Sequence, residues 1–423
     1  MSELSYLEKL LDGVEVEWKT LEDISIKISS GGTPKTGVSE FYDGDIPWLR
    51  TQEVNFCDIW DTEVKITESG VKNSSAKWIP KNCVIVAMYG ATVGKIGINK
   101  IPMTTNQACA NIQLNEEVAH YRYVFHFLCS QYTYIKSLGT GSQTNINAQI
   151  VKNIKIPIPC PDNPEKSLAI QSEIVRILDK FTALTAELTA ELTAELNMRK
   201  KQYNYYRDQL LSFKEGEVEW KTLGEIGDFT YGYAAKAMDS GDARFVRITD
   251  INKDGKLSKE NPMYVELNEE NEKYTLDKND LLMARTGATF GKTMIFEEDY
   301  PAVYAGFLIK LNLNKTIINA KYYWHFAQSD FFWEQANKLV SGGGQPQFNA
   351  NALKQVRVPI PYPSHPQKSL DEQGRIVDIL DKFDAITASI TEGLPREIEL
   401  RQKQYEYYRD LLLSFPKPET VSN

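Results

Sequence analysis

The longest regular hydrophobic pattern in the chain lies in residues 170–213, where apolar residues recur at steps of three and four. This spacing places them on one face of an α-helix. The segment contains no glycine or proline and is rich in Ala, Leu, Glu and Lys, which favour helices. A helix with one apolar stripe needs a partner that covers the stripe. The stripe consists of Ile174, Ile177, Leu178, Phe181, Leu184, Leu188, Leu192 and Leu196.

The tetrapeptide Thr-Ala-Glu-Leu occurs three times in succession within this segment. Four residues advance an α-helix by about 6 Å and about 400°, which leaves a net turn of about 40°. Each repeat therefore lengthens the helix while its leucine face stays nearly in place. The repeat positions are Thr185, Leu188, Thr189, Leu192, Thr193 and Leu196.

The helical pattern returns 202 residues downstream, so the chain is a duplication of one unit, a globular part followed by a long helix. Three segments repeat at this shift: 174–181 at 376–383, 201–208 at 403–410, and 15–21 at 217–223. The second helix departs from the tetrapeptide repeat. It contains Gly393 and Pro395, which are expected to interrupt or kink it.

Outside the helices the pattern changes to short β-type runs between turns rich in Gly, Pro and Asn. Each globular part also contains one expected helix, near 118–131 and 320–339. We therefore predict two α+β domains of mixed, mostly antiparallel sheet. The expected boundaries are an N-terminal helix (1–13, helical from Ser2 to Leu11), a first domain (14–161), a central helix (162–216), a second domain (217–363), a C-terminal helix (364–415) and a tail (416–423).

Composition narrows the class of protein. The 423 residues include no apolar run long enough to span a membrane, and no secretory leader is recognisable. The five cysteines never form a Cys-x-x-Cys pair, which favours buried, reduced thiols in a cytoplasmic protein over zinc or disulfides. The net charge of −9 argues against a nucleic-acid binder that acts without partners.

The two globular parts share a few landmarks and differ almost everywhere between them. Arg50 corresponds to Arg247, and the turn 90–95 corresponds to 287–292, both at a shift of 197 residues. Loops rich in Gly, Ser, Gln and Asn follow at 139–147 and 341–349. Such a pattern indicates two related modules that bind different things in one geometry.

Each motif that suggests catalysis is incomplete. The turn 287–293 has three residues between its glycines where a phosphate loop needs four. Residues 261–264 read Asn-Pro-Met-Tyr, one residue away from an adenine-methylase motif, but no glycine-rich cofactor loop accompanies them. Glu63 and Lys65 have nuclease-like spacing without an upstream Pro-Asp partner. His126 and His325 occupy matching helical positions, which favours packing, so no catalytic residues are predicted and the chain is not expected to be an enzyme.

Polar loop residues are the candidates for contact with a ligand. Arg50 and Arg247 form either structural ion pairs with Glu53 and Asp250 or contacts with DNA, where arginine commonly reads guanine. The Ser/Gln/Asn loops can bond base edges or phosphates, although polar surface turns look the same. The candidate DNA-binding residues are Thr33, Lys35, Arg50, Tyr89, Lys95, Asn106, Gln107, Ser142, Gln143, Asn145, Arg247, Arg285, Lys292, Gln345 and Gln347.

The whole chain resembles the specificity subunit of a type I restriction–modification system, of the type IC-like subclass with Thr-Ala-Glu-Leu spacer repeats. The resemblance depends on the duplicated helices ending in Tyr-Tyr-Arg-Asp, on the tandem repeat, and on landmarks such as Gly-Gly-Thr-Pro at 31–34. It implies two target-recognition domains, each reading half of a split double-stranded DNA site. Between them, two long helices would pair as an antiparallel coiled coil with pseudo-two-fold symmetry.

The resemblance also implies partners and cofactors. The helices would dock methylase subunits, two per complex, and restriction subunits would join through the complex. The repeat number would set the length of the unread spacer in the DNA. No cofactor or metal is expected on this chain, while the complex would use S-adenosylmethionine, and ATP with Mg for restriction. Two alternatives are a coiled-coil scaffold that does not read DNA and a self-contained methylase or nuclease.

Overall fold

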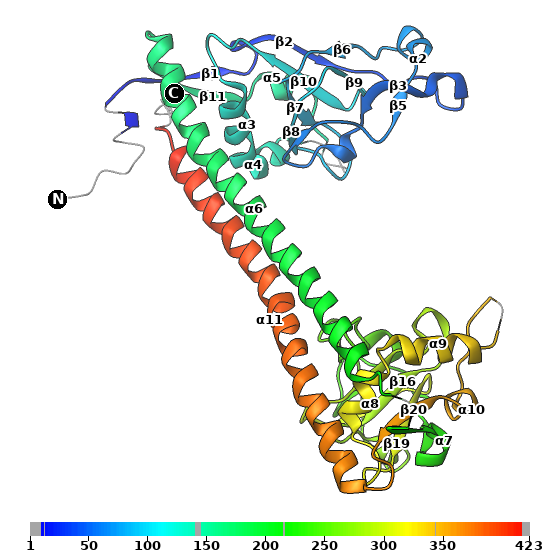
Figure 1. The fold of residues 1–423 in the computed structure, drawn as a ribbon. Helices are drawn as coiled ribbons and strands as arrows, with labels where there is room; N and C mark the ends of the chain where they lie inside the picture. Colours follow the sequence, from blue (N-terminus) through cyan, green and yellow to red (C-terminus); the bar gives the residue numbers. More distant parts are fainter. Residues whose placement is uncertain (1–9, 12, 140–144, 215, 343, 417–423) are drawn as a thin grey trace. The chain divides into compact units, whose positions relative to one another are not determined.

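Two helices of 47 residues each, α6 (Pro164–Leu210) and α11 (Pro366–Leu412), dominate this computed structural model (Figure 1). The structure describes residues 10–11, 13–139, 145–214, 216–342 and 344–416. The chain divides into two units, one containing the residues up to Ala190 and those from Pro395 onward, the other Glu191–Leu394. Each unit therefore holds one domain, the beginning of one long helix and the end of the other.

The expected N-terminal helix and C-terminal tail lie mostly outside the described residues; of the former, Leu10 and Leu11 are described and helical. The central helix is continuous, as expected, and begins at Pro164. The missing N–H of proline costs nothing there, because N–H groups in the first turn have no partner within the helix. The expected interruption of the second helix is wrong, because α11 continues through Gly393 and Pro395. Pro395 removes one backbone hydrogen bond, a local cost that the helical residues on both sides outweigh.

The first domain contains three sheets, in the orders β1-β11, β2-β10-β7-β8-β4 and β5-β3-β9-β6. Only the β4–β8 and β3–β9 pairs are parallel among the described strands. The strands are β1 (Val16–Thr20), β2 (Ser25–Ser30), β3 (Tyr42–Leu49), β4 (Cys57–Ile59), β5 (Lys65–Ile66), β6 (Trp78–Ile79), β7 (Val84–Ala87), β8 (Ile96–Asn99), β9 (Met103–Thr105), β10 (Cys109–Leu114) and β11 (Lys155–Pro159). The helices are α2 (Glu68–Lys72), α3 (Tyr121–Ser130), α4 (Tyr132–Ser137) and α5 (Ala148–Lys152), with 3-10 turns η1 (Ser39–Phe41) and η2 (Thr51–Glu53).

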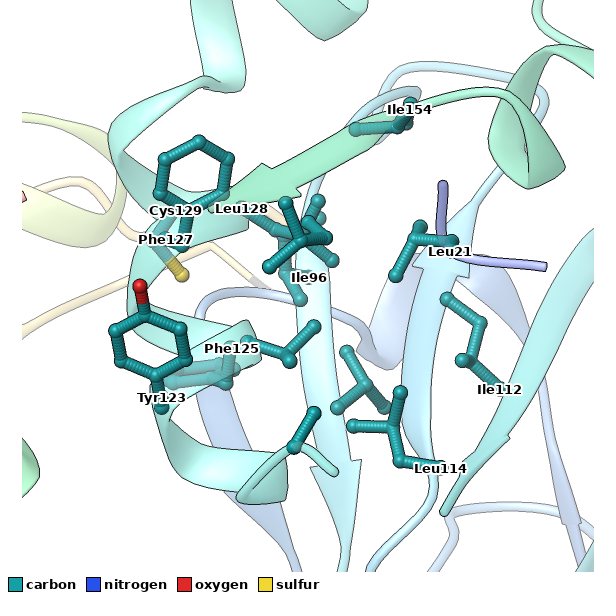
Figure 2. Close-up of a cluster of buried hydrophobic side chains, with 14 of the residues drawn as sticks. Leu21, Ile96, Ile112, Leu114, Tyr123, Phe125, Phe127, Leu128, Cys129 and Ile154 are labelled. Atoms are coloured by element: carbon teal, nitrogen blue, oxygen red, sulfur yellow. The ribbon is translucent and has the colours of Figure 1, made fainter. Parts of the chain in front are cut away.

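The core of the first unit lies between α3 and the five-stranded sheet (Figure 2). The end of the chain belongs to the same core: Leu412, Leu413 and Phe415 are buried there, and the Phe415 ring meets Tyr123 edge to face at 6.2 Å. The Trp18 indole N–H also donates to the Pro416 carbonyl, at 2.8 Å. The first domain is therefore completed by residues nearly 400 positions away in sequence.

The second domain repeats this plan with sheets β12-β20, β13-β19-β16-β17 and β15-β14-β18, of which only β14–β18 is a parallel pair among the described strands. The strands are β12 (Val218–Thr222), β13 (Gly227–Tyr231), β14 (Ala243–Val246), β15 (Tyr264–Val265), β16 (Leu281–Ala284), β17 (Thr293–Ile295), β18 (Ala302–Tyr304), β19 (Leu308–Leu313) and β20 (Arg357–Pro361). The helices are α7 (Leu223–Ile226), α8 (Ala320–Phe326), α9 (Asp330–Leu339) and α10 (Ala350–Leu353), with 3-10 turns η3 (Ile248–Asp250), η4 (Glu272–Tyr274) and η5 (Gly287–Thr289).

The expected α+β class is confirmed, with two corrections to helices. The single helix expected at 320–339 is two, because the Ser329 hydroxyl accepts a hydrogen bond from the Phe332 N–H and starts α9 as a separate helix. The helix expected at 118–131 begins at Tyr121 and is followed directly by α4. Cys57 is also exposed, whereas the other four cysteines are buried as expected.

A buried histidine joins the first domain to both helices. His126 of α3 lies with Nε2 2.8 Å from Asp179 Oδ1 on α6 and with Nδ1 3.0 Å from the Tyr405 hydroxyl on α11. Because an ionised carboxylate only accepts hydrogen bonds, Nε2 carries the proton and the tyrosine donates to Nδ1. Burial lowers the pKa of His126 and favours the neutral ring. We call these three residues the first joint cluster.

The second unit contains the same arrangement with the helices exchanged. His325 of α8 lies 2.9 Å from Asp381 Oδ1 on α11 and 2.8 Å from the Tyr203 hydroxyl on α6. Burial again lowers the pKa of the histidine. We call His325, Asp381 and Tyr203 the second joint cluster.

The two helices also pack directly on each other within each unit, through one stacked aromatic pair. The pairs are Phe181 with Tyr408 in the first unit and Phe383 with Tyr206 in the second, with ring centroids 5.0 and 5.1 Å apart. The beginning of one helix thus lies beside the end of the other, which makes the pairing antiparallel in each unit.

The joint clusters predict a pH dependence of stability. The pKa of each buried histidine is lower in the folded protein than its unfolded value of about 6.5, so the unfolded state binds more protons below that pH. The free energy of unfolding should therefore be highest above about pH 7 and fall as the pH drops, by at most about 1.4 kcal/mol per pH unit for each histidine. Urea unfolding between pH 7.5 and 5.5 measures this.

The variant His126→Asn with His325→Asn should be less stable at pH 7.5 and should lose most of this pH dependence. The exposed His365, changed to Asn, is the matched control and should leave the dependence intact. An unaltered pH dependence in the double variant would contradict the assignment to the joint clusters.

Candidate nucleic-acid interface

Strand register brings the loops that carry the candidate residues of the first domain to one end of the strands. We call this end of a domain, where the polar loops lie together, its polar edge. Ser30 pairs with Ala110, and Ala87 pairs with Cys109, so the end of β2, the end of β7 and the beginning of β10 are neighbours. The parallel pair β3–β9 ends at the same edge, where Leu49 is opposite Thr105. Segments far apart in sequence therefore present their loops together.

Hydrogen bonds connect these loops to one another. The Thr33 hydroxyl donates to the Gln107 side-chain oxygen, and the Asn106 N–H donates to the Leu49 carbonyl at 2.9 Å. The Thr92 hydroxyl, in the turn after Tyr89, donates to the Thr51 carbonyl at 2.7 Å.

The remaining candidates of the first domain are less constrained. Lys35 is exposed and Tyr89 is partly exposed at the same edge. Asn145 adjoins Tyr89, because the Ile146 N–H donates to the Met88 carbonyl at 3.0 Å. Ser142 and Gln143 lie outside the described residues.

Arg50 and Arg247 both form structural ion pairs, which was one of the two possibilities that the sequence left open for them. Arg50 lies 2.6 Å from Glu63 and 3.6 Å from Glu53, and Arg247 binds Asp250 through two nitrogens, at 2.9 and 3.2 Å. These hydrogen bonds raise the pKa of Arg247. Both guanidinium groups remain partly exposed, so the ion pairs orient them without covering them.

In the second domain an arginine lies over two aromatic rings. The Arg285 guanidinium carbon lies 5.1 Å from the Tyr231 ring and 5.4 Å from the Phe307 ring, and its Nε donates to the Gly306 carbonyl at 3.1 Å. Phe307 is 56% exposed and Tyr231 is 43% exposed, so both rings are open to solvent beside the arginine. Sequence reasoning missed Tyr231 and Phe307, because aromatic residues at strand ends resemble core residues in sequence.

The loop 341–349 lies against the same edge. The Gln347 amide donates to the Thr286 hydroxyl at 2.8 Å, and the Gly287 N–H donates to the Pro346 carbonyl at 3.0 Å. Gln345 is exposed beside them. The turn that begins at Gly287 is the tight connection between β16 and β17, as the sequence predicted, and Gly287 has a φ of +70° that favours glycine.

Two residues of the motifs that suggest catalysis form contacts with arginine side chains. Glu63 is paired with Arg50, and the Asn261 carbonyl accepts a hydrogen bond from Arg247 at 3.2 Å. Within the described ranges, no group of three or more His, Cys, Asp or Glu side chains could hold a metal ion. In the same ranges, no helix has the length and apolar character needed to span a bilayer.

Comparison with known proteins identifies the family. The sequence model of the family described as "Type I restriction modification DNA specificity domain" matches residues 13–198 and again 215–400. The chain belongs to this family of specificity subunits. The double match coincides with the internal duplication, and it supports sequence-specific DNA recognition over the scaffold alternative.

Similar members of the specificity family match over nearly their whole length. The EcoR124I/EcoR124II specificity subunit of Escherichia coli is 41% identical, with all of both chains covered. The EcoprrI specificity subunit of Escherichia coli is 38% identical over 93% of each chain. A putative specificity subunit of Haemophilus influenzae, S.HindORF215P, is 32% identical over 97% of this chain and 98% of its own.

Solved structures share the fold of this specificity subunit. A chain from a study of the assembly and conformational transition of the type I R-M system superposes with a TM-score of 0.67, at 17% identity, over 94% of this chain and 97% of that one. The HsdS subunit from Thermoanaerobacter tengcongensis gives 0.53 at 14% identity, over 94% and 96%. The likeness extends through both domains and both long helices.

The edge of the first domain depends on a close backbone approach at Gly31. A Cβ atom added there would lie 1.8 Å from the Thr105 carbonyl oxygen, so either β2 or β9 must move. We predict that Gly31→Ala lowers the free energy of unfolding by about 1–3 kcal/mol. Gly344→Ala, where an added Cβ meets nothing within 4 Å, is the matched control. Thermal unfolding of both variants measures the difference, and equal stability would show that the approach is not needed.

Proposed function

We propose that each domain of this specificity subunit reads one half of a split double-stranded DNA site through the loops at its polar edge. One observation carries the proposal: candidate residues scattered over each domain's sequence come together at one edge, and they do so in both domains. The two edges differ in chemistry. The first presents hydroxyl and amide groups such as Thr33 and Gln107, whereas the second presents Arg285 beside two aromatic rings. Different chemistry on one frame suits two different half-sites.

Arg285 is the side chain best prepared to read a base. The two rings and the Gly306 carbonyl restrict its orientation, so less conformational entropy is lost on binding. Its terminal nitrogens have no protein partner among the described residues, so they stay available for the paired acceptors of guanine in the major groove. The exposed Phe307 ring next to it supplies apolar contact to a base.

The long helices are proposed to dock methylase subunits, two per complex, and to hold the two half-sites at a fixed spacing. Large apolar side chains remain exposed along them, including Leu184, Met198 and Tyr205 on α6 and Leu400 and Tyr407 on α11. Exposed apolar surface on a charged helix pair is typical of a protein interface. Restriction subunits would join through the same complex.

The chain itself is proposed to be non-catalytic and to bind no cofactor. S-adenosylmethionine, and ATP with Mg, would act on the partner subunits, which would also supply positive charge around the duplex that this acidic chain lacks. Adding S-adenosylmethionine and DNA to the isolated chain tests this: methyl transfer without partners would instead support the self-contained methylase.

Replacing Arg285 should relax one half-site only. A bidentate arginine contact is worth about 1–3 kcal/mol of discrimination, so Arg285→Ala should reduce preference for the matching base by roughly 5- to 150-fold. Competition binding of the methylase complex to DNAs altered in one half-site measures this, with Lys278→Ala, at the opposite end of β16, as the control. Unchanged discrimination at every position would remove Arg285 from the set of base readers.

Deleting one repeat, Thr189–Leu192, should shorten the unread spacer without altering either half-site. The deletion removes about 6 Å of helix, equivalent to roughly two base pairs at 3.4 Å each. Genome-wide adenine methylation, read by single-molecule sequencing in cells that carry the chain and its methylase, reports the recognised motif. Altered half-sites with an unaltered spacer would argue against the role of the repeats, and a continuous motif would argue against two separate reading domains.

A further inference from the structure

A cavity of about 350 Å³ lies in the second unit, bounded by the end of α6, the turn 252–255 and the beginning of α11. Its wall carries four cationic side chains, two carboxylates and the ring of Trp333. The cations are Lys200, Arg207, Lys253 and Lys292, and the carboxylates are Asp254 and Asp384. Neither the catalytic motifs nor the edge loops explain this concentration of positive charge.

The turn that forms one wall has a fixed conformation. The Asn252 side-chain oxygen accepts hydrogen bonds from the backbone N–H groups of Asp254 and Lys256, both at 2.9 Å. Gly255 has a φ of +71°, and an added Cβ would lie 2.8 Å from the Thr293 carbonyl. The turn therefore holds Lys253 exposed at its tip in a defined place.

Part of the charge in the cavity is already compensated. Lys200 lies 3.5 Å from Asp254, and Lys256 neutralises Asp384 at 2.6 Å. The buried Arg207 is paired with Asp208. The side-chain ammonium groups of Lys253 and Lys292 form no hydrogen bond or ion pair with any residue that the structure describes. Two positive charges are thus left to attract an anion.

The first domain differs at the corresponding place. There Asn55 corresponds to Asn252, and its side chain accepts a hydrogen bond from Lys95, the counterpart of Lys292, at 2.8 Å. Phe56 replaces Lys253 and packs edge to face on Tyr132 at 5.2 Å. The position that carries a packed aromatic ring in the first domain carries a lysine in the second. The space beside this lysine stays open and positively charged.

We propose that this cavity holds a phosphate group, and that the source is the DNA backbone where the duplex leaves the half-site read by the second domain. The proposal depends on the proposed function. Lys292 is the last residue of the turn that connects β16 to β17 at the polar edge, and it also lines the cavity, so the cavity continues the edge toward the helices. Lysine ammonium groups donate to phosphate oxygens in any direction, which suits a backbone contact without base readout.

The salt dependence of DNA binding tests the proposal. In the complete complex with methylase subunits, each lost phosphate contact should reduce the slope of log K against log salt by about 0.9. Because the cavity holds one phosphate, we expect a reduction of about 0.9 for Lys253→Gln with Lys292→Gln, and a smaller reduction for Lys253→Gln alone because Lys292 remains. The preference of Lys253→Gln for matching over mismatched half-sites should stay as in the parent chain. Lys278→Gln, an exposed lysine at the opposite end of β16, is the control and should keep the parent slope.

A second measurement separates DNA from free phosphate. Titration calorimetry of the complex with inorganic phosphate should show no binding at millimolar concentration. If phosphate binds and Lys253→Gln abolishes this while the salt slope stays unaltered, the source is a free phosphate and the DNA assignment is overturned. Unaltered slopes without phosphate binding overturn the site itself. A parent complex without any half-site preference would instead contradict the proposed function.

Discussion

The hydrogen bonds of a neutral, buried imidazole are the constraint on which each half of this specificity subunit depends. In both joint clusters the ring donates to an aspartate at the beginning of one long helix and accepts from a tyrosine at the end of the other. A buried imidazole with both nitrogens bonded fixes three segments at once. Without it the tyrosine hydroxyl would lose its acceptor, while Asp179 would keep Arg122 and Asp381 would keep Lys321. The polar edge of each domain therefore has a fixed orientation with respect to the helical segments of its own unit.

On this frame the loops are free to differ. The strands determine only where the loops begin and end, as the shared register of β2-β10-β7 and β13-β19-β16 illustrates. The side chains that the loops carry can then change without cost to the core. The pair Lys95 and Lys292 shows how small such a change is: the same lysine is bound to a neighbour in one domain and available in the other, because the adjacent asparagine bonds a different group.

Much of this architecture could be predicted from the sequence, because its signals are periodic and duplicated. The repeat established two domains and two helices, and many of the β-type runs became strands. Contacts that depend on tertiary packing could not be predicted. The continuity of α11 through Pro395 depends on the helical residues on both sides of it, and the separation of α8 from α9 depends on one serine cap. The two rings beside Arg285 come from the end of β13 and from the turn before β19, and no local pattern marks them as exposed.

The burial of Leu412, Leu413 and Phe415 in the first domain has a consequence for synthesis on the ribosome. The first domain is translated early, yet its core is incomplete until residues 412–415 have emerged. The second unit, in contrast, contains all of its segments once residue 394 has left the exit tunnel. The order in which the two cores close is therefore the reverse of the order in which their domains are translated, and a chain that stops before Leu412 lacks part of the core of the half that was made first.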